Sequence, residues 1–283
     1  MDSVKRILFP TDFSDGSQAA FRYALKLADF AEASVEVLHV VYPETEPLDF
    51  PVLATKVMKE RTEAARKALK GFIDLGLSQV ITTGSIQHIP VTPIDIEIGV
   101  PGEVIASVAA RDEADLIIMG TRENHSALDR LLGSVTTSVV RKAPCPVWIV
   151  PPEAEYSSFG SVVFATNLLE SDPFHLIALS TLLARHDPVF RVVHVQKAPD
   201  EETELSLKEF ETLFQEKLPE ISATFHQTAG NSVIDEIDEV AGRFDADLIV
   251  MFRSHRGLFS RLTEPGVTRK MALHTHFPLL VLK

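Results

Sequence analysis

A carboxylate and a glycine that directly follow apolar runs could bind a nucleoside. Asp12 comes shortly after the run Ile7–Phe9, and its side chain can accept hydrogen bonds from an adenine amino group or a ribose hydroxyl. Gly120 follows the run Leu116–Met119, and a ligand could lie against its backbone because glycine has no side chain. The pattern therefore predicts a binding site for a sugar and a base.

A phosphate could bind further along the chain. Gly133 precedes the segment 134–142, which has the pattern of a helix and opens with Ser134, Val135 and Thr136. The free backbone N–H groups at a helix start, two hydroxyls and the helix dipole would together hold a phosphate group.

The same residues also have purely structural explanations. A helix after the first strand could be capped by Asp12, Ser14 or Asp15, and a Gly-Ser pair is a common turn before a helix. The nucleotide interpretation gains weight because these motifs occur together at the ends of apolar runs, and both interpretations stay open at this point.

Other chemistries find little support in the sequence. His255, His274 and His276, with His226 and Asp247, could ligate a metal, but no cysteine pair and no His-Glu-x-x-His pattern accompanies them. Ser134 lacks the Gly-x-Ser-x-Gly surroundings of a nucleophile, and no Gly-x4-Gly-Lys-Ser/Thr loop exists. We therefore expect neither a metal site nor a catalytic residue.

Alternating strands and helices would position the predicted site. Short apolar runs predict buried strands at Ile7–Phe9, Val35–Val40, Leu116–Met119 and Val147–Val150. Helical spacing predicts helices at Gly16–Ala31, Thr55–Leu75, Val104–Glu113 and Ser134–Lys142. Such βαβ units form a parallel sheet, and ligands of these sheets bind beyond the carboxyl ends of the strands, where the strand order reverses.

An internal repeat divides the chain. Residues 6–40 parallel residues 161–195, and residues 114–150 parallel residues 246–283, with a shared Ala-Asp-Leu-Ile. We predict two domains, 1–152 and 153–283, joined by a proline-rich linker, each a Rossmann-like α/β unit with a five-stranded mostly parallel sheet. The first copy is longer around residues 41–100, and there we read the extended stretch 82–100 as a strand plus an inserted hairpin or lid.

Composition narrows the class of protein. Among the 283 residues, 27 Lys and Arg oppose 40 Asp and Glu, so the net charge is −13 and the field of the protein repels nucleic acids and anionic lipid. The single cysteine, Cys145, excludes an internal disulfide, and no apolar run is long enough to span a bilayer. We expect a cytoplasmic protein without nucleic-acid or membrane partners.

The sequence resembles a tandem universal stress protein. The resemblance rests on Ile7–Ser14, Leu38–Val40, Gly99–Ile105 and Asp115–Val150. ATP-binding members of that family carry Gly-x2-Gly-x9-Gly-(Ser/Thr), which Gly120 and Gly133-Ser134 match, whereas Glu123 replaces the middle glycine. A carboxylate there adds bulk and repels phosphates, although Arg122, His125 and Arg130 could offset it, so we expect adenine and ribose to be recognised better than a triphosphate.

The resemblance implies a site in the first domain for ATP or another adenine nucleotide, which Mg²⁺ can accompany. Asp12 and the Val40 backbone would hold adenine, Gly120 would lie near the ribose, and the start of the helix at Ser134 would meet the phosphates. The implied site residues are Pro10, Thr11, Asp12, Val40, Met119, Gly120, Arg122, Gly133, Ser134, Val135 and Thr136.

The second domain departs from the family pattern. Phe252, His255 and Pro265 replace the three glycines, although Gly266 follows one position late, and Asn167 replaces the aspartate. A phenylalanine would fill the space of a ribose, and proline removes an N–H donor at the helix start. We infer that residues 161–283 do not bind ATP in the manner of the family.

Three functional hypotheses follow. The first is a stress-response binding module with at most slow ATP hydrolysis. The second is an enzyme: a slow ATP hydrolase, or a catalyst that acts on a small ligand in the altered second pocket. The third is a chaperone-like scaffold without nucleotide. The resemblance further implies that the two domains pair through Val147–Val150 and Leu279–Leu282, and a homodimer of the chain stays open.

Overall fold

Two compact units make up the chain. The computed structural model describes residues 4–43, 51–121, 134–168, 172–196, 201–252 and 277–283. The amino-terminal unit spans Val4–Tyr156, and the carboxy-terminal unit extends from Ser157 to Lys283. Strands and helices alternate in both units, which confirms the predicted α/β class.

The amino-terminal unit contains a parallel sheet of the order β3-β2-β1-β4-β5. Its strands are β1 (Arg6–Pro10), β2 (Ser34–Val41), β3 (Ile94–Ile98), β4 (Leu116–Gly120) and β5 (Val147–Val150). Its helices are α1 (Asp15–Ala31), α2 (Pro51–Thr82), α3 (Pro101–Arg111) and α4 (Ser134–Lys142). The predicted strands and helices are all present, with ends that differ by a few residues except in α2.

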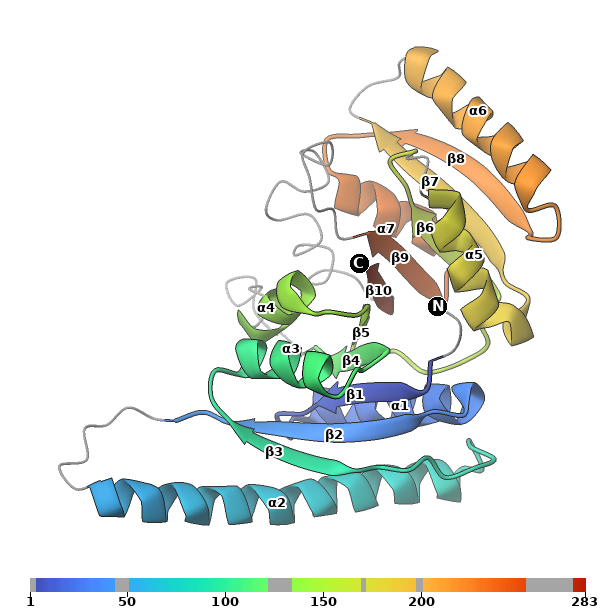
Figure 1. Ribbon diagram of the computed structural model, residues 1–283. Helices are drawn as coiled ribbons and strands as arrows, with labels where there is room; N and C mark the ends of the chain where they lie inside the picture. The colour runs from blue at the N-terminus through green and yellow to red at the C-terminus, as the bar shows by residue number, and fades with distance from the viewer. Residues whose placement is uncertain (1–3, 44–50, 122–133, 169–171, 197–200, 253–276) are drawn as a thin grey trace. The chain divides into compact units, whose positions relative to one another are not determined.

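The strand order reverses between β1 and β4. From β1 the chain moves outward to β2 and β3, and it then returns to β4 and β5 on the other side of β1. Helix α1 packs beside α2, and α3 packs beside α4 (Figure 1). Because crossovers between parallel strands are right-handed, the first pair of helices covers one face of the sheet and the second pair covers the other. The carboxyl ends of β1 and β4 therefore flank the predicted ligand crevice.

The core of this unit is apolar on both faces of the sheet. The side chains of β1, β4 and β5 are almost all buried, as expected for strands covered by helices on both sides. Phe9 packs against Phe21 of α1 with ring centroids 5.2 Å apart, and Phe72 of α2 completes an aromatic cluster. This cluster fixes α1 and α2 on the sheet and thereby positions the turn that follows β1.

The carboxy-terminal unit repeats this arrangement, with the strand order β10-β9-β6-β7-β8. Its strands are β6 (Ser161–Ala165), β7 (Val189–Gln196), β8 (Ala223–Ala229), β9 (Leu248–Phe252) and β10 (Leu279–Leu282). Its helices are α5 (Asp172–Leu183), a short 3-10 helix (Ala184–His186), α6 (Glu201–Lys217) and α7 (Val233–Arg243). Among the described residues, no helix combines the length and the apolar character that crossing a membrane requires.

The stretch 82–100 contains the predicted strand, β3, but it does not contain an inserted hairpin, and the alternative of a lid stays a prediction. Residues 83–93, all of which the structure describes, contain neither helix nor strand, and β3 is the one strand within residues 82–100. Much of the additional length lies in α2, which has 32 residues and continues to Thr82, whereas its counterpart α6 has 17. The prolines around residue 90 suggested turns of a hairpin, but they fall in the connection from α2 to β3.

The repeated Ala-Asp-Leu-Ile has a structural cause. A carboxylate oxygen of Asp115 accepts hydrogen bonds from the backbone N–H groups of Lys5 and Arg6, both at 2.8 Å. Asp247 does the same for Gly160 and Ser161, at 2.8 and 2.9 Å. In each unit, this aspartate secures the start of the first strand beside the strand that follows the aspartate. Asp247 therefore has a structural role, which sequence analysis did not assign to it.

Candidate functional site

The turn between β1 and α1 is held by its own side chains. The Thr11 hydroxyl oxygen accepts hydrogen bonds from the Phe13 backbone N–H at 3.0 Å and from the Ser17 hydroxyl at 2.8 Å. Thr11 is buried, and its backbone N–H donates to the carbonyl oxygen of Leu38 in β2. These bonds keep Phe13 in the left-handed region, with φ at 65°. The backbone that carries Asp12 therefore has a defined conformation.

Asp12 is exposed at this turn, and its carboxylate has a defined orientation. One carboxylate oxygen accepts from the Ser14 backbone N–H at 3.1 Å and from the Ser14 hydroxyl at 2.6 Å. Ser14 itself caps α1, because its side chain accepts from the N–H of Ser17. Of the three candidate caps, the structure selects Ser14. Asp12 orients that cap and presents a carboxylate at the end of β1.

His39 of β2 connects the ends of two strands. Its ring Nδ1 lies 2.9 Å from the Thr11 carbonyl oxygen, and because a carbonyl only accepts, Nδ1 carries the proton. The Phe13 ring stacks on the imidazole, with centroids 4.3 Å apart and planes inclined by 26°. Sequence analysis missed His39 and Phe13 as site residues. The repeated His-Val at the end of the second strand of each half was the available signal.

The end of β2 presents backbone groups to the crevice. Leu38 pairs with Pro10 in the sheet, and its carbonyl faces β1, where it accepts from Thr11. Backbone groups along a strand alternate between the two neighbouring strands, so the N–H and C=O of Val40 point to the same side as those of Leu38. Beyond Pro10, however, the chain leaves the sheet for the β1–α1 turn. Val40 therefore directs its backbone donor and acceptor to the β1 side of the sheet, beyond the last residue of β1.

Gly120 at the end of β4 is required by the packing of α1. A Cβ atom at this position would lie 2.8 Å from the carbonyl oxygen of Gly16 and 3.0 Å from the Cβ of Ala20. Both distances are shorter than ordinary contacts, so any side chain there would displace α1. Met119, the preceding residue, is buried. Gly120 thus permits the close approach of α1 to β4, a reason that sequence analysis did not identify.

The predicted phosphate-binding residues are only partly within the described chain. Helix α4 begins at Ser134, as predicted, with Val135 half-buried and Thr136 buried. Arg122 and Gly133 lie outside the described residues, as do Glu123, His125 and Arg130. The structure therefore brings Pro10, Thr11, Asp12 and Val40 together at adjacent strand ends, with Met119 and Gly120 at the neighbouring end of β4.

The same position in the carboxy-terminal unit is built differently. Thr166 and Asn167 follow β6. At the end of β9, the centroid of the Phe252 ring lies 4.3 Å from that of the His175 ring and 5.3 Å from that of the Phe164 ring. Asp172 in the first turn of α5 is buried and accepts a hydrogen bond from the Thr166 hydroxyl. His255, Pro265 and Gly266 lie outside the described residues.

The metal hypothesis gains nothing from the histidines that the structure describes. His226 lies 2.8 Å from the Thr224 hydroxyl and packs on the Phe244 ring, whereas His274 and His276 lie outside the described residues. Burial and the neighbouring guanidinium groups of Arg191 and Arg243 lower the pKa of His226.

Three carboxylates in the amino-terminal unit do lie close together. Oxygen atoms of Glu36, Asp95 and Asp112 lie within 4.8 Å of one another. The Arg111 guanidinium donates to Asp95 at 2.8 Å and to Asp112 at 2.7 Å, so a cation of the chain itself bridges two members of the group. Burial, followed by the charges of Asp112 and Asp95, raises the pKa of Glu36, and the Arg111 charge opposes this shift.

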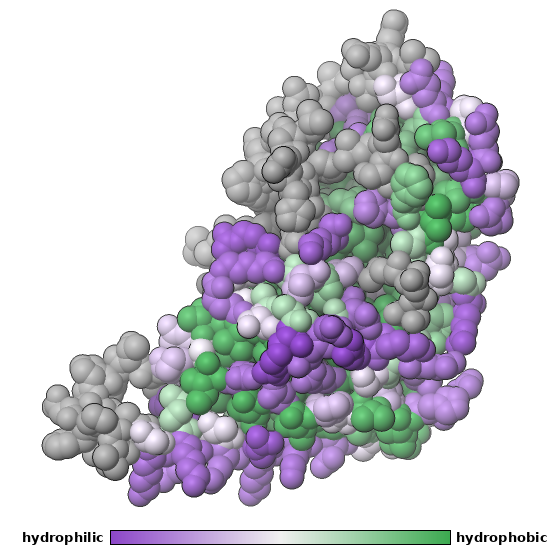
Figure 2. Space-filling view, viewed as in Figure 1, coloured by the Kyte–Doolittle hydropathy of each residue, from purple (hydrophilic) through white to green (hydrophobic). Residues whose placement is uncertain are grey.

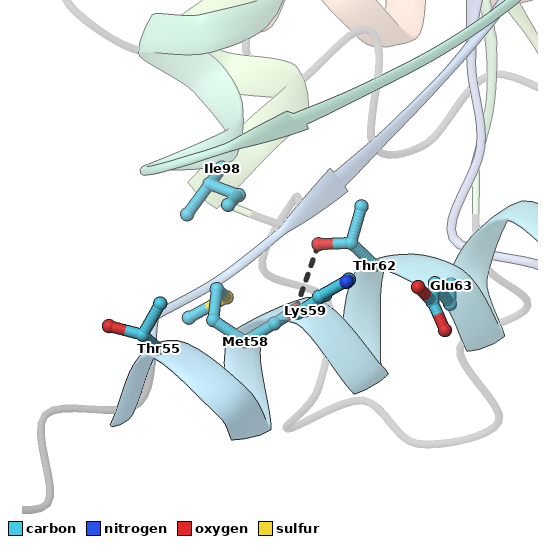
Figure 3. Close-up of a pocket in the computed structure, with 6 residues that line it drawn as sticks. All are labelled: Thr55, Met58, Lys59, Thr62, Glu63 and Ile98. Atoms are coloured by element: carbon cyan, nitrogen blue, oxygen red, sulfur yellow. Dashed lines mark hydrogen bonds between the residues drawn. The ribbon is translucent and has the colours of Figure 1, made fainter. Parts of the chain in front are cut away.

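A cavity of about 610 Å³ lies elsewhere in the amino-terminal unit, between the first turns of α2 and the end of β3 (Figure 3). It is lined by Thr55, Met58, Lys59, Thr62, Glu63 and Ile98. The Thr62 hydroxyl donates to the Met58 backbone carbonyl and so is engaged within the helix. This cavity lies at β3, which β2 separates from β1 in the sheet, and it shares none of the predicted site residues.

Comparisons with known proteins agree on one family. The model of the universal stress protein family matches residues 3–151 and again residues 161–283. A universal stress protein of Methanocaldococcus jannaschii is 32% identical over 154 residues, which are 52% of this chain and 81% of that protein.

Solved structures resemble the whole chain. A universal stress protein from Archaeoglobus fulgidus gives a TM-score of 0.74 at 20% identity, with 98% of each chain covered. The protein PA1789 from Pseudomonas aeruginosa PAO1 gives a TM-score of 0.61 at 16% identity, covering 100% of this chain and 93% of that one. At these identities, the two structures support the fold alone.

Proposed function

The chain belongs to the universal stress protein family, and from this premise we propose that its amino-terminal unit binds an adenine nucleotide as a stress-response binding module. The nucleotide would be ATP, ADP or AMP. The observation that carries the proposal is the oriented carboxylate of Asp12 at the end of β1, next to the end of β2 that carries Val40, at the point where the strand order reverses.

These two groups suit the edge of an adenine ring. Adenine offers an amino donor and ring nitrogen acceptors, and the Val40 backbone supplies one acceptor and one donor. The Asp12 carboxylate accepts from the amino group or from a ribose hydroxyl. Because Ser14 already orients this carboxylate, binding costs little side-chain entropy. The start of α4, with the hydroxyls of Ser134 and Thr136, is the proposed phosphate end, and Mg²⁺ would arrive with the nucleotide.

The test is calorimetric titration of the full chain with ATP, ADP and AMP, with GTP as the control base. We expect adenine nucleotides to bind and Asp12→Ala to weaken them about tenfold, whereas Asn167→Ala, the matched change in the carboxy-terminal unit, leaves the affinity unchanged. Equal binding of GTP and ATP, or no binding of any nucleotide, would contradict the proposal and favour a nucleotide-free scaffold.

Phosphate release separates the module from a hydrolase. We expect bound ATP to remain intact over many hours. Turnover that falls in a Ser134→Ala variant would instead assign the amino-terminal unit to a slow ATP hydrolase. Turnover that is insensitive to this change and to Asp12→Ala would point to the carboxy-terminal unit.

A further inference from the structure

Helices α2 and α6 occupy the same place in the two units, and both cover their sheet with an apolar face. Phe72 of α2 packs on Phe9 and Phe21, and Phe214 of α6 packs on Phe225 of β8 with ring centroids 5.4 Å apart. Each helix follows the second strand of its unit and precedes the third. The two helices therefore present their remaining faces to the outside of their own unit.

The two helices carry opposite net charges. Helix α2 contains six Lys and Arg against three Asp and Glu, although the whole chain has a net charge of −13. Its basic residues are all exposed: Lys56, Lys59, Arg61, Arg66, Lys67 and Lys70. Helix α6 contains six Glu against two Lys, and Glu209 and Glu216 are exposed. In Figure 2, hydrophilic residues line the surface over α2.

Small and apolar residues lie between the charges on α2. Val57, Ala64, Ala68, Gly71 and Leu75 are exposed at helical spacing, and we call them the α2 seam. Leu75 is 49% exposed, and a Cβ atom added at Gly71 would meet no atom within 4 Å. Side chains this small let a second helix approach closely, and exposed Leu and Val gain free energy when they are covered.

We propose that α2 of one chain docks against α6 of a second copy of this chain. Two copies of α2 would repel, because both are basic, whereas α6 supplies the opposite sign on a helix of the same protein. A phosphate backbone would satisfy the charges and leave the α2 seam uncovered, so a helix is the better occupant. The exposed Lys67 and Lys70, which flank the seam, would face exposed carboxylates such as Glu209 and Glu216.

Charge reversal tests the proposal, with sedimentation velocity as the measurement. One variant carries Lys67→Glu and Lys70→Glu, and the other carries Glu209→Lys and Glu216→Lys. We expect the wild-type chain to self-associate and each variant to weaken this association about tenfold or more, because facing charges become alike. A mixture of the two variants restores the assembly, since every contact between unlike variants again joins opposite charges.

Matched controls separate this effect from net charge. Lys5→Glu with Lys26→Glu changes the charge by the same amount as the first variant, and Glu153→Lys with Glu155→Lys matches the second, outside both helices. Both controls should assemble like the wild type. The proposal is overturned if the wild-type chain is monomeric. A monomeric chain that binds anionic vesicles or RNA overturns it as well. It is equally overturned if either reversal leaves the assembly intact, if a control disrupts it as strongly, or if mixing the reversed variants restores nothing.

Discussion

The two units share a turn and differ in what surrounds it. Thr11 and Thr166 each accept a hydrogen bond from the backbone N–H two residues later, and Phe13 and Leu168 both take positive φ angles, of 65° and 61°. His39 and His194 each bind the carbonyl of that threonine, at 2.9 and 3.0 Å. The strand-end turn therefore forms with or without the glycines of a nucleotide site.

The surroundings diverge at the ends of β4 and β9. Where the amino-terminal unit has Gly120 close to Ala20, the carboxy-terminal unit has Phe252 packed on His175. The comparison shows that turn geometry and the space for a ligand are separable. The turn is set by local hydrogen bonds, whereas the space depends on how closely the first helix approaches the fourth strand of its unit.

A second difference lies in the charge beside the C-terminal end of the third helix in each unit. Glu36 of β2 lies near Asp112, which follows α3, whereas Arg191 of β7 stacks over the ring of Phe244, which follows α7. Acidic neighbours raise the pKa of Glu36, and basic neighbours help to lower the pKa of His226. The titratable groups in this region of the fold thus respond to acid in opposite directions in the two units.

The largest expected effect comes from replacing Gly120 with phenylalanine, the residue type of its counterpart Phe252. We expect Gly120→Phe to weaken adenine-nucleotide binding about 100-fold or more, because even a Cβ there meets the Gly16 carbonyl oxygen at 2.8 Å and α1 must move. Calorimetric titration measures the loss, and circular dichroism reports whether the sheet persists. Gly242→Ala, where a Cβ meets nothing within 4 Å, is the control. Unchanged affinity in Gly120→Phe would refute the placement of the site.

The aspartates that secure the first strand of each unit should be equivalent. Asp115→Ala and Asp247→Ala each leave two backbone N–H groups without their acceptor, and we expect each change to cost about 2 kcal/mol of unfolding free energy. Chemical denaturation measures each loss of unfolding free energy, and hydrogen exchange assigns it to one of the two units. A large loss in one variant and none in the other would break the equivalence of the two units.

A third prediction concerns Glu123, which stands where the family pattern has its middle glycine. We expect Glu123→Gly to tighten ATP binding about tenfold and AMP binding much less, because the carboxylate repels the outer phosphates most strongly. Parallel titrations with ATP and AMP measure the difference, and Glu123→Gln separates charge from bulk. Equal gains for both nucleotides would show that Glu123 does not face the phosphates.

Acid should affect the two units differently, with the smallest effect of the four. Burial lowers the pKa of His175, His186 and His226, so their stabilising contribution is present above the ordinary histidine value and is lost as the pH falls through it. The raised pKa of Glu36 acts oppositely, because the contribution of that group grows as the pH falls toward the ordinary carboxyl value.

Hydrogen exchange at about pH 7 and about pH 5.5, corrected for intrinsic rates, measures this difference. We expect the carboxy-terminal unit to lose about 1 kcal/mol or less, since all three histidines are partly solvated. The amino-terminal unit should lose less, and the reverse order would contradict the assignment of these shifts.

The sequence predicted the elements because hydrophobic periodicity is local. The strands at Leu116 and Val147 and the helix at Ser134 follow directly from apolar runs and helical spacing. It did not predict the full length of α2, which extends beyond the predicted Thr55–Leu75 at both ends, to Pro51 and to Thr82. Gly76 and the β-branched residues 80–82 have low intrinsic helix propensity, so the local sequence indicates an end near Leu75. Val80 is buried, so tertiary packing extends the helix past this point.

The candidate site was predictable by residue type and only partly by geometry. Asp12 at a strand end was evident. Its orientation by Ser14 and the stacking of Phe13 on His39, however, depend on the left-handed backbone conformation of Phe13, which no local sequence pattern predicts. The packing role of Gly120 involves Gly16 and Ala20 of a helix distant in sequence. Contacts of this kind become visible only when the strands are placed side by side.

The hydrogen bonds of Asp115 and Asp247 bear on the order in which the protein folds during synthesis. The amides of Lys5 and Arg6 acquire their acceptor only after residue 115 has left the ribosome, so the first strand must wait for most of its own unit. Gly160 and Ser161, in turn, depend on residue 247. None of these four hydrogen bonds joins a residue before Tyr156 to a residue after it. The nascent amino-terminal unit can therefore complete its sheet while the ribosome is still translating the rest of the message.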